Sequence, residues 1–194
     1  MAVEFLSVLA KACDGRPATF ETGQSLFRQG DAVRWLYLIS EGQVRLSRML
    51  AMGSEIALAR VTDGQILAEA SVFSPNYHCD AIAERQTKAS QYAMSDVRAL
   101  LRDKPEASLA YGAHLAGEVM DLRAMSEIRA IRRADDRLLA WLQLHARDGT
   151  FDGQGAWPSI ARQIGLSGES IYRALAALER TGRIKRRGGK TTIC

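Results

Sequence analysis

The pattern of small and apolar residues between Trp157 and Ala174 constrains the fold of this chain more than any other feature. Ala161 suits a position where two helices approach closely, and Gly165, four residues later, suits a turn that needs a positive φ. Ile171 follows at the spacing expected of a second helix that packs back on the first. The pattern therefore predicts a helix-turn-helix, and its alternative is an ordinary helical hairpin. The other residues that fill the seam are Ile160, Ile164, Leu166 and Ala174.

The second helix is predicted to begin after Ser167, which is a good N-cap residue. In a helix-turn-helix, the first residues of the second helix face base edges in the major groove of DNA. Glu169 can accept a hydrogen bond from cytosine N4, and Arg173 can donate two to guanine O6 and N7. Ser170 can reach a phosphate or a base. The alternative role of Glu169 is to interact with the helix dipole.

The segment after Gly182 is typical of two short strands joined by a Gly188-Gly189 hairpin turn, which would complete a winged helix. Residues 151–194 hold eight basic and three acidic residues, a net charge of +5, whereas the whole chain carries +4. Positive charge is therefore concentrated where phosphate contact would require it. The candidate DNA-binding residues are Ser167, Gly168, Glu169, Ser170, Arg173, Arg180, Lys185, Arg186, Arg187 and Lys190.

Composition argues against several other classes of protein. The sequence has no apolar stretch of about 18–20 residues and no basic leader, so we expect a cytoplasmic protein without a membrane partner. The three cysteines, Cys13, Cys79 and Cys194, do not form a disulfide framework, a Cys-x-x-Cys metal site or a four-cysteine cluster. An enzyme would need a metal site, a phosphate-binding glycine loop or a nucleophile elbow, and we find none of these patterns. We therefore expect neither an enzyme nor a metal site.

Residues 19–94 are typical of short strands separated by turn signals at roughly 8–12-residue intervals. We expect strands at residues 35–39, 44–49, 56–61, 80–83 and 88–93, with Gly42 ending the first of them. This spacing predicts an antiparallel β-barrel or sandwich.

Two segments within this region, Gly23–Asp31 and Leu36–Leu46, resemble the double-stranded β-helix of cyclic-nucleotide-binding domains. With the winged helix behind them, nearly the whole chain resembles the Crp/Fnr family of bacterial transcription regulators. The resemblance implies an α+β fold with a jelly-roll-like sensor domain at 1–104, a dimerisation helix at 105–134 and a winged helix-turn-helix DNA-binding domain at 135–194. Residues 167–173 are similar to the recognition helix of the family, but Gly168 stands where many members carry Arg or another side chain, which implies a different operator.

A long helical pattern from about Glu106 to Arg133 is apolar on two faces, and both faces must be covered. One face can lie on the barrel and the other on a second subunit, although burial inside one monomer is an alternative. Asp135-Asp136 are predicted to cap the next helix, which runs to His145, and residues 149–155 are predicted to form a loop. The predicted dimer interface is Ala113, Ala116, Met120, Ala124, Ile128 and Ile131, and the second apolar stripe is Leu115, Val119, Leu122 and Met125.

The cyclic-nucleotide pocket of the resembled family has a Gly-Glu pair for the ribose and, ten residues after the Glu, an Arg followed by Ser or Thr for the phosphate. This chain has Ala68-Glu69 and then Cys79-Asp80 at those positions. The missing Arg removes a bidentate contact and the acid repels a phosphate, so we expect no physiological binding of cyclic AMP. The candidate pocket residues are Glu69, Ala70, Cys79, Asp80, Leu122 and Arg123.

Other inputs to the sensor domain stay open, and we expect no cofactor unless it is haem. His78 and Cys79 lie where haem-containing relatives place axial ligands. Cys79 or Cys13 could be a redox switch if its thiolate is stabilised, although Asp80 would raise the pKa of Cys79. An unidentified effector, no effector and an atypical cyclic-AMP pocket complete the alternatives. The leading interpretation is a homodimer that binds a pseudo-palindromic operator in double-stranded DNA, with RNA polymerase as a further partner.

Overall fold

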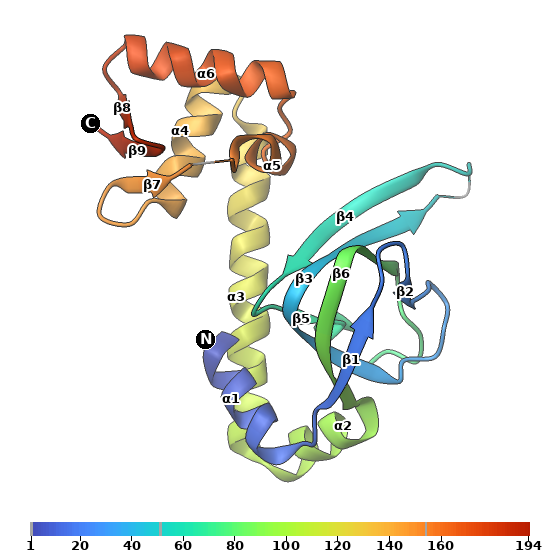
Figure 1. Ribbon diagram of the computed structural model, residues 1–194. Coiled ribbons are helices and arrows are strands. Elements are labelled where there is room, and N and C mark those ends of the chain that lie inside the picture. The colour runs from blue at the N-terminus through green and yellow to red at the C-terminus, as the bar shows by residue number, and fades with distance from the viewer. Residues whose placement is uncertain (1, 51, 154) are drawn as a thin grey trace. The chain divides into compact units, whose positions relative to one another are not determined.

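The computed structural model describes residues 2–50, 52–153 and 155–194, and it divides the chain into two compact units, residues 1–117 and 118–194 (Figure 1). Each unit has its own hydrophobic core. Helix α3 (Pro105–Ala130) includes the boundary between the units. No helix within the described ranges is long and apolar enough to cross a membrane.

The N-terminal unit is built around a curled antiparallel sheet in which strands follow the order β1–β6–β3–β4 (Figure 1). Strand β2 pairs with β6, and β5 pairs with β3. Leu36, Ile39 and Val44 of β3 are fully buried in the core that the sheet encloses. The strands are β1 (Arg16–Phe20), β2 (Ser25–Phe27), β3 (Trp35–Met49), β4 (Glu55–Thr62), β5 (Ile66–Leu67) and β6 (Asp80–Ala93).

Strands β3 and β6 are longer than the sequence analysis predicts. Gly42 does not end a strand, because β3 continues through it with a φ of 117° and with shifts of register on both sides. A Cβ at Gly42 would lie 2.5 Å from Thr87 Oγ1, so this irregularity requires glycine. The strands expected at 80–83 and 88–93 are one strand, β6, which pairs with β3 along its whole length.

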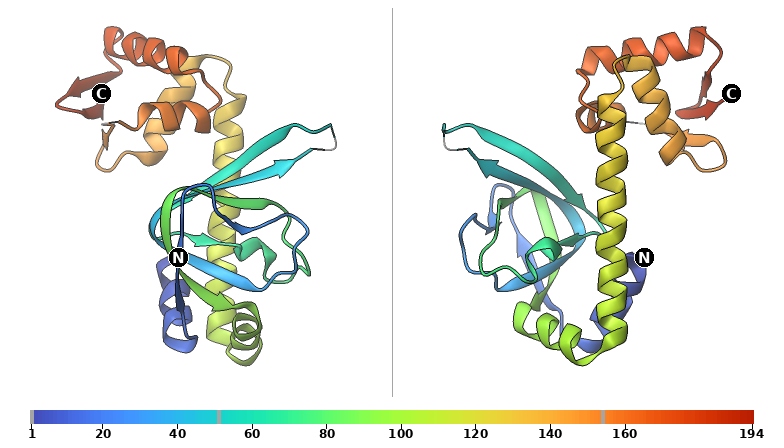
Figure 2. Two further views of the ribbon diagram at one scale, coloured as in Figure 1. Left: turned by 45° about the vertical axis from the view of Figure 1, so that its right-hand side comes forward. Right: turned by 180° about the vertical axis from the view of Figure 1, so that it is seen from behind.

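Three helical segments accompany this sheet, and the sequence analysis assigned none of them. Helix α1 (Ala2–Ala12) lies beside the first part of α3 (Figure 2), where the ring of Phe5 is 5.2 Å from that of Tyr111 and 6.1 Å from that of His114. A short 3-10 helix, η1 (Glu69–Ser71), follows β5, and α2 (Met94–Asp103) continues directly from β6. Helices α1 and α2 each cover part of the same apolar core.

The C-terminal unit is a winged helix, with a three-stranded sheet in the order β7–β9–β8. Ala161 is 1% exposed between the helices and Gly165 has a φ of 68°, which confirms the predicted close approach and turn. The elements are α4 (Ala134–His145), β7 (Thr150–Asp152), α5 (Trp157–Gln163), α6 (Gly168–Arg180), β8 (Ile184–Arg187) and β9 (Lys190–Ile193).

Two local predictions for this unit are wrong. The segment 149–155, expected to be a loop, contains strand β7, which pairs with β9. Helix α4 begins at Ala134 with Arg133 as its N-cap residue, so Asp135 and Asp136 lie in the first turn instead of capping the helix. Acids in the first turn still stabilise the helix through its dipole.

Candidate nucleic-acid interface and sensor site

Helix α6 has one buried and one exposed face. Ser167 is its N-cap, as predicted, and the Ser167 Oγ accepts a hydrogen bond from the backbone N–H of Ser170 at 3.1 Å. The buried face packs Ile171, Ala174, Leu175 and Leu178 against the core. The opposite face presents Glu169, Tyr172, Arg173 and Arg180 to solvent, and sequence reasoning gave no role to Tyr172, which is 52% exposed. Tyr172 could have been assigned to this face from the sequence, because it follows Glu169 at the i, i+3 spacing of residues that share a helix face.

Glu169 and Arg173 are paired on this outer face. The Arg173 Nη1 lies 3.3 Å from the Glu169 Oε1, and its Nη2 donates to the Ser170 Oγ at 3.2 Å. Both charged side chains are mostly exposed, so the ion pair adds little to folding stability. Its effect is instead to place the guanidinium beside the first turn of α6, where 69% of the Arg173 side chain stays exposed.

The hairpin of β8 and β9 separates its cations between two faces. Arg187 pairs with Lys190, and Lys185 with Thr192, so the three cations share one exposed face. Both glycines of the turn have positive φ values, 57° and 83°, which confirms the predicted two-residue hairpin.

Arg186 lies on the other face of the hairpin from this group of cations. Its Nη2 is 2.7 Å from the Glu179 Oε2 of α6, and this ion pair connects the hairpin to the helix. This contact differs from the phosphate contact expected from the sequence.

Helix α3 presents an unusual amount of apolar surface. Ala107, Ala110, Tyr111 and His114 are buried on one side, whereas Leu109 and Met120 are 76% and 65% exposed. The predicted residues Ala113, Ala116 and Met120 lie on the side opposite the buried residues, by helical periodicity. Sequence reasoning missed Leu109, which shares this side at i−4 from Ala113.

The remaining predicted interface residues lie in the last part of the helix and just beyond it. Ile128 is only 6% exposed because it packs in the core of the C-terminal unit, so its assignment to a dimer interface is wrong. Ala124 and Ile131 are half-buried.

The predicted sensor residues begin at a strained turn. Ala68 has a φ of 75°, the left-handed conformation that glycine adopts readily, and it starts helix η1. The backbone therefore has the conformation expected of the glycine in the Gly-Glu pair of the resembled family, although this chain has alanine at that position. The phenol of Tyr111, on α3, donates to the backbone carbonyl of Glu69 at 2.8 Å. Ala70 follows on the exposed side of η1.

Neither of the two residues that stand in place of a phosphate site is a cation, and the guanidinium of the nearby Arg48 donates instead to the backbone carbonyl of His78. Cys79 is 2% exposed, and the Asp80 Oδ1 accepts a hydrogen bond from the backbone N–H of Gln29 at 2.7 Å. A buried thiol and a structural carboxylate are chemically unsuited to hold a phosphate. Leu122 and Arg123, the other predicted pocket residues, are exposed on the part of α3 that belongs to the C-terminal unit.

The chemistry of these residues also argues against haem and thiol sensing. Burial raises the pKa of Cys79 to about 11, which disfavours a thiolate ligand or nucleophile. His78 is exposed on the surface between Ser71 and Arg48, where its own backbone carbonyl accepts from the Arg48 Nε at 3.0 Å. A haem would need its ligand beside an apolar pocket, so these residues do not fit one.

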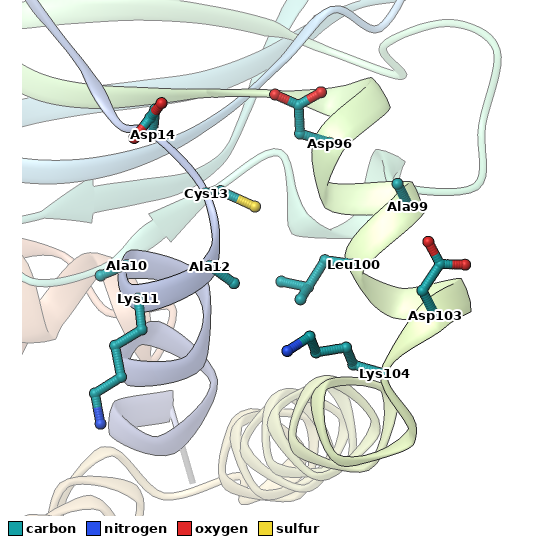
Figure 3. Close-up of a pocket in the computed structure, with 10 residues that line it drawn as sticks. All are labelled: Ala10, Lys11, Ala12, Cys13, Asp14, Asp96, Ala99, Leu100, Asp103 and Lys104. Atoms are coloured by element: carbon teal, nitrogen blue, oxygen red, sulfur yellow. The ribbon is translucent and has the colours of Figure 1, made fainter.

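Cys13 lines a hollow of about 540 Å³ between α1 and α2 (Figure 3). The carboxylates of Asp14, Asp96 and Asp103 and the ammonium of Lys104 lie around it. Burial, followed by the charges of Asp96 and Asp14, raises the pKa of Cys13. Burial and the nearby carboxylates therefore disfavour the thiolate form of Cys13, which a redox switch requires.

Comparison with known proteins agrees with this architecture. The family described as "Cyclic nucleotide-binding domain" matches residues 17–104. The global nitrogen regulator of Nostoc sp. is 26% identical over 188 residues, which cover 90% of this chain and 83% of that protein. The cyclic AMP receptor protein of Thermus thermophilus is 27% identical over 168 residues, which cover 86% and 78%. In sequence and in fold, the chain resembles the Crp/Fnr family of transcription regulators.

The likeness to solved structures extends over both units. The structure of FixK2 from Bradyrhizobium japonicum superposes with a TM-score of 0.67 at 18% identity and covers 92% of both chains, which confirms the predicted α+β fold. The relatives are named as regulators or receptors, such as the global nitrogen regulator and the cyclic AMP receptor protein, and neither of these two names is that of an enzyme.

Proposed function

We propose that this chain is a sequence-specific DNA-binding regulator of the Crp/Fnr type that acts as a homodimer. The observation that carries the proposal is the exposed face of α6, where Arg173 is held in place by Glu169 and Ser170. A guanidinium fixed at the start of a recognition helix is preorganised for two hydrogen bonds to a guanine. Glu169 then orients Arg173 as well as accepting from a cytosine.

The hairpin supplies the sequence-independent part of the binding energy. Lys185, Arg187 and Lys190 share one exposed face, and cations in this position neutralise phosphates and position the helix. Ser167 and Arg180 extend this surface at the two ends of α6. On the other face of the hairpin, Arg186 forms an ion pair with Glu179 of α6.

The proposed dimer forms through α3. Leu109, Ala116 and Met120 place an exposed apolar stripe on the side of the helix opposite its buried residues. A second copy of the same helix is a symmetric partner for such a stripe, and the small residues allow close approach. We accordingly assign residues 1–104 to a sensor domain, 105–134 to the dimerisation helix and 135–194 to the DNA-binding domain.

The effector of the sensor domain is proposed to be a molecule other than cyclic AMP, or none. The relative from Thermus thermophilus is named as a cyclic AMP receptor. In this chain, Cys79 and Asp80 supply a buried thiol and a carboxylate where a phosphate would need an arginine and a hydroxyl. Calorimetry with cyclic AMP tests this directly: no heat of binding is expected, and micromolar or tighter affinity would contradict it.

DNA binding is tested by selecting ligands of the purified protein from a random-sequence duplex library. We expect enrichment of two inverted half-sites with centres about 34 Å, or one helical turn, apart. The matched control is Arg173→Ala, which leaves the hairpin cations in place and is expected to retain duplex while losing the preference at one base pair of each half-site. Equal enrichment of unrelated sequences by the wild type would refute the proposed function.

A further inference from the structure

The guanidinium of Arg137 joins two helix ends in the C-terminal unit. Its Nε and Nη2 donate to the backbone carbonyl of Ile131 at 2.9 and 2.6 Å, just beyond the end of α3. Its Nη1 donates to the carbonyls of Ile164 and Gly165 at 3.1 and 3.2 Å, in the turn between α5 and α6. One side chain therefore satisfies carbonyls at the C-terminal ends of two helices, where the helix dipoles also favour a cation.

A second arginine makes a parallel connection. The Nε of Arg129, on the last turn of α3, donates to the backbone carbonyl of Gln163 at 2.8 Å, at the end of α5. Ile128 adds apolar contact with the same core. The hydrophobic effect is non-directional, whereas the hydrogen bonds of a planar guanidinium have fixed directions. The two arginines therefore add directional contacts between the end of α3 and the helix-turn-helix to the apolar packing of Ile128.

We propose that Arg137 is a positioning residue that fixes the direction of α6 relative to α3, and thereby sets the half-site spacing that the dimer accepts. This inference rests on the proposed DNA-binding dimer. Only residues 131–133 join α3 to α4 along the chain. The contacts of Arg137 span that junction and reach the turn that precedes α6, so they transmit the orientation of α3 to the recognition helix.

The chemistry of the contact makes arginine specific at this position. The fork of a guanidinium presents N–H donors in several fixed directions, whereas a lysine ammonium is a single point of charge. Lysine at position 137 could bind the carbonyl of Ile131 or those of the turn, but not both sets at their present distances. A conservative Arg137→Lys substitution is therefore expected to rescue the spacing preference only in part.

The test separates spacing from base recognition. Arg137→Met removes the fork and keeps the length of the side chain, and Arg132→Met is the matched control because Arg132 is an exposed arginine at the same junction. Dissociation constants are measured on the operator selected by the wild type, on the same half-sites moved apart by one and two base pairs, and on an operator with one changed base. Thermal unfolding of each variant is recorded in parallel.

The wild type and Arg132→Met are expected to lose about tenfold or more in affinity for each added base pair, since each base pair turns one half-site by about one tenth of a helical turn. Arg137→Met is expected to lose less than about threefold, with its penalty for the changed base unchanged.

An equal spacing penalty in Arg137→Met and the wild type would overturn the proposal, as would a uniform loss of affinity on every operator. If Arg137→Met does not fold, Arg129→Met and Arg137→Lys carry the same test, with an intermediate spacing penalty expected. A wild type with no sequence preference would refute the proposed function itself, and that result is visible without any variant.

Discussion

The paired substitutions Arg173→Ala and Lys190→Ala test whether the two parts of the proposed interface have different roles. Arg173 lies at the start of α6 with 69% of its side chain exposed, and Lys190 lies on the exposed face of the β8–β9 hairpin. Neither side chain belongs to the core, so both variants should fold like the wild type. Loss of the exposed Glu169–Arg173 ion pair would cost only about 0.3–0.5 kcal/mol of folding stability.

The expected effects on DNA binding differ in kind. A bidentate arginine–guanine contact contributes about 1–3 kcal/mol of discrimination, so two half-sites together give about 2–6 kcal/mol, or about 30-fold to 10⁴-fold. Arg173→Ala should remove this discrimination at one base pair of each half-site. Lys190→Ala should leave discrimination intact and weaken all sequences, with the salt dependence of log K reduced by about 1.8 for two lost phosphate contacts.

Fluorescence anisotropy with labelled duplexes at several salt concentrations measures both quantities. Each protein is titrated against the selected operator and against a duplex in which the presumed guanine of each half-site is replaced. The roles assigned to these residues are refuted if both variants weaken every duplex by the same factor, or if Lys190→Ala changes the base preference.

Three further predictions concern the dimer, the turn at Ala68 and the buried thiol. Met120→Asp places a charge on the exposed apolar stripe of α3, where its desolvation in an interface is costly, and should give a monomer by analytical ultracentrifugation; an unchanged dimer would contradict the assignment. Ala68→Gly relieves a φ of 75° and should stabilise the protein by about 0.5–1 kcal/mol in urea unfolding, whereas a loss of stability would show that the turn is not strained. Cys79, with a pKa of about 11, should be alkylated slowly at pH 8 and faster as the pH rises toward that value; peptide mass spectrometry that finds rapid alkylation at pH 7 would disprove the burial argument.

The winged helix could be predicted closely because its determinants are local. Gly165 and the Gly188-Gly189 turn are each required by backbone geometry at one place in the chain, and Ala161 by the close approach of two neighbouring helices. Gly42 shows the limit of the same reasoning. A glycine with positive φ ends a strand or forms an irregularity within it, and only the partner strand, β6, decides between the two.

The contacts that join elements could not be predicted from the sequence. Arg137 reaches carbonyls six and twenty-seven residues away, and nothing in its neighbourhood along the chain distinguishes it from the exposed Arg132. Ile128 has the helical spacing of an interface residue, but it is buried in the core of its own unit and is not available to a second subunit. Helix α1 did leave a signal, since Phe5 and Leu9 are spaced four residues apart and both are fully buried.

Hydroxyl-radical footprinting of the protein on its selected operator tests the central claim most directly, because it shows how many recognition helices are engaged and how far apart they lie. We expect two protected segments related by two-fold symmetry, with centres one helical turn or about 10 base pairs apart. A single protected segment, or protection spread evenly along the duplex, would contradict the account of a dimer that presents two copies of α6 to one operator.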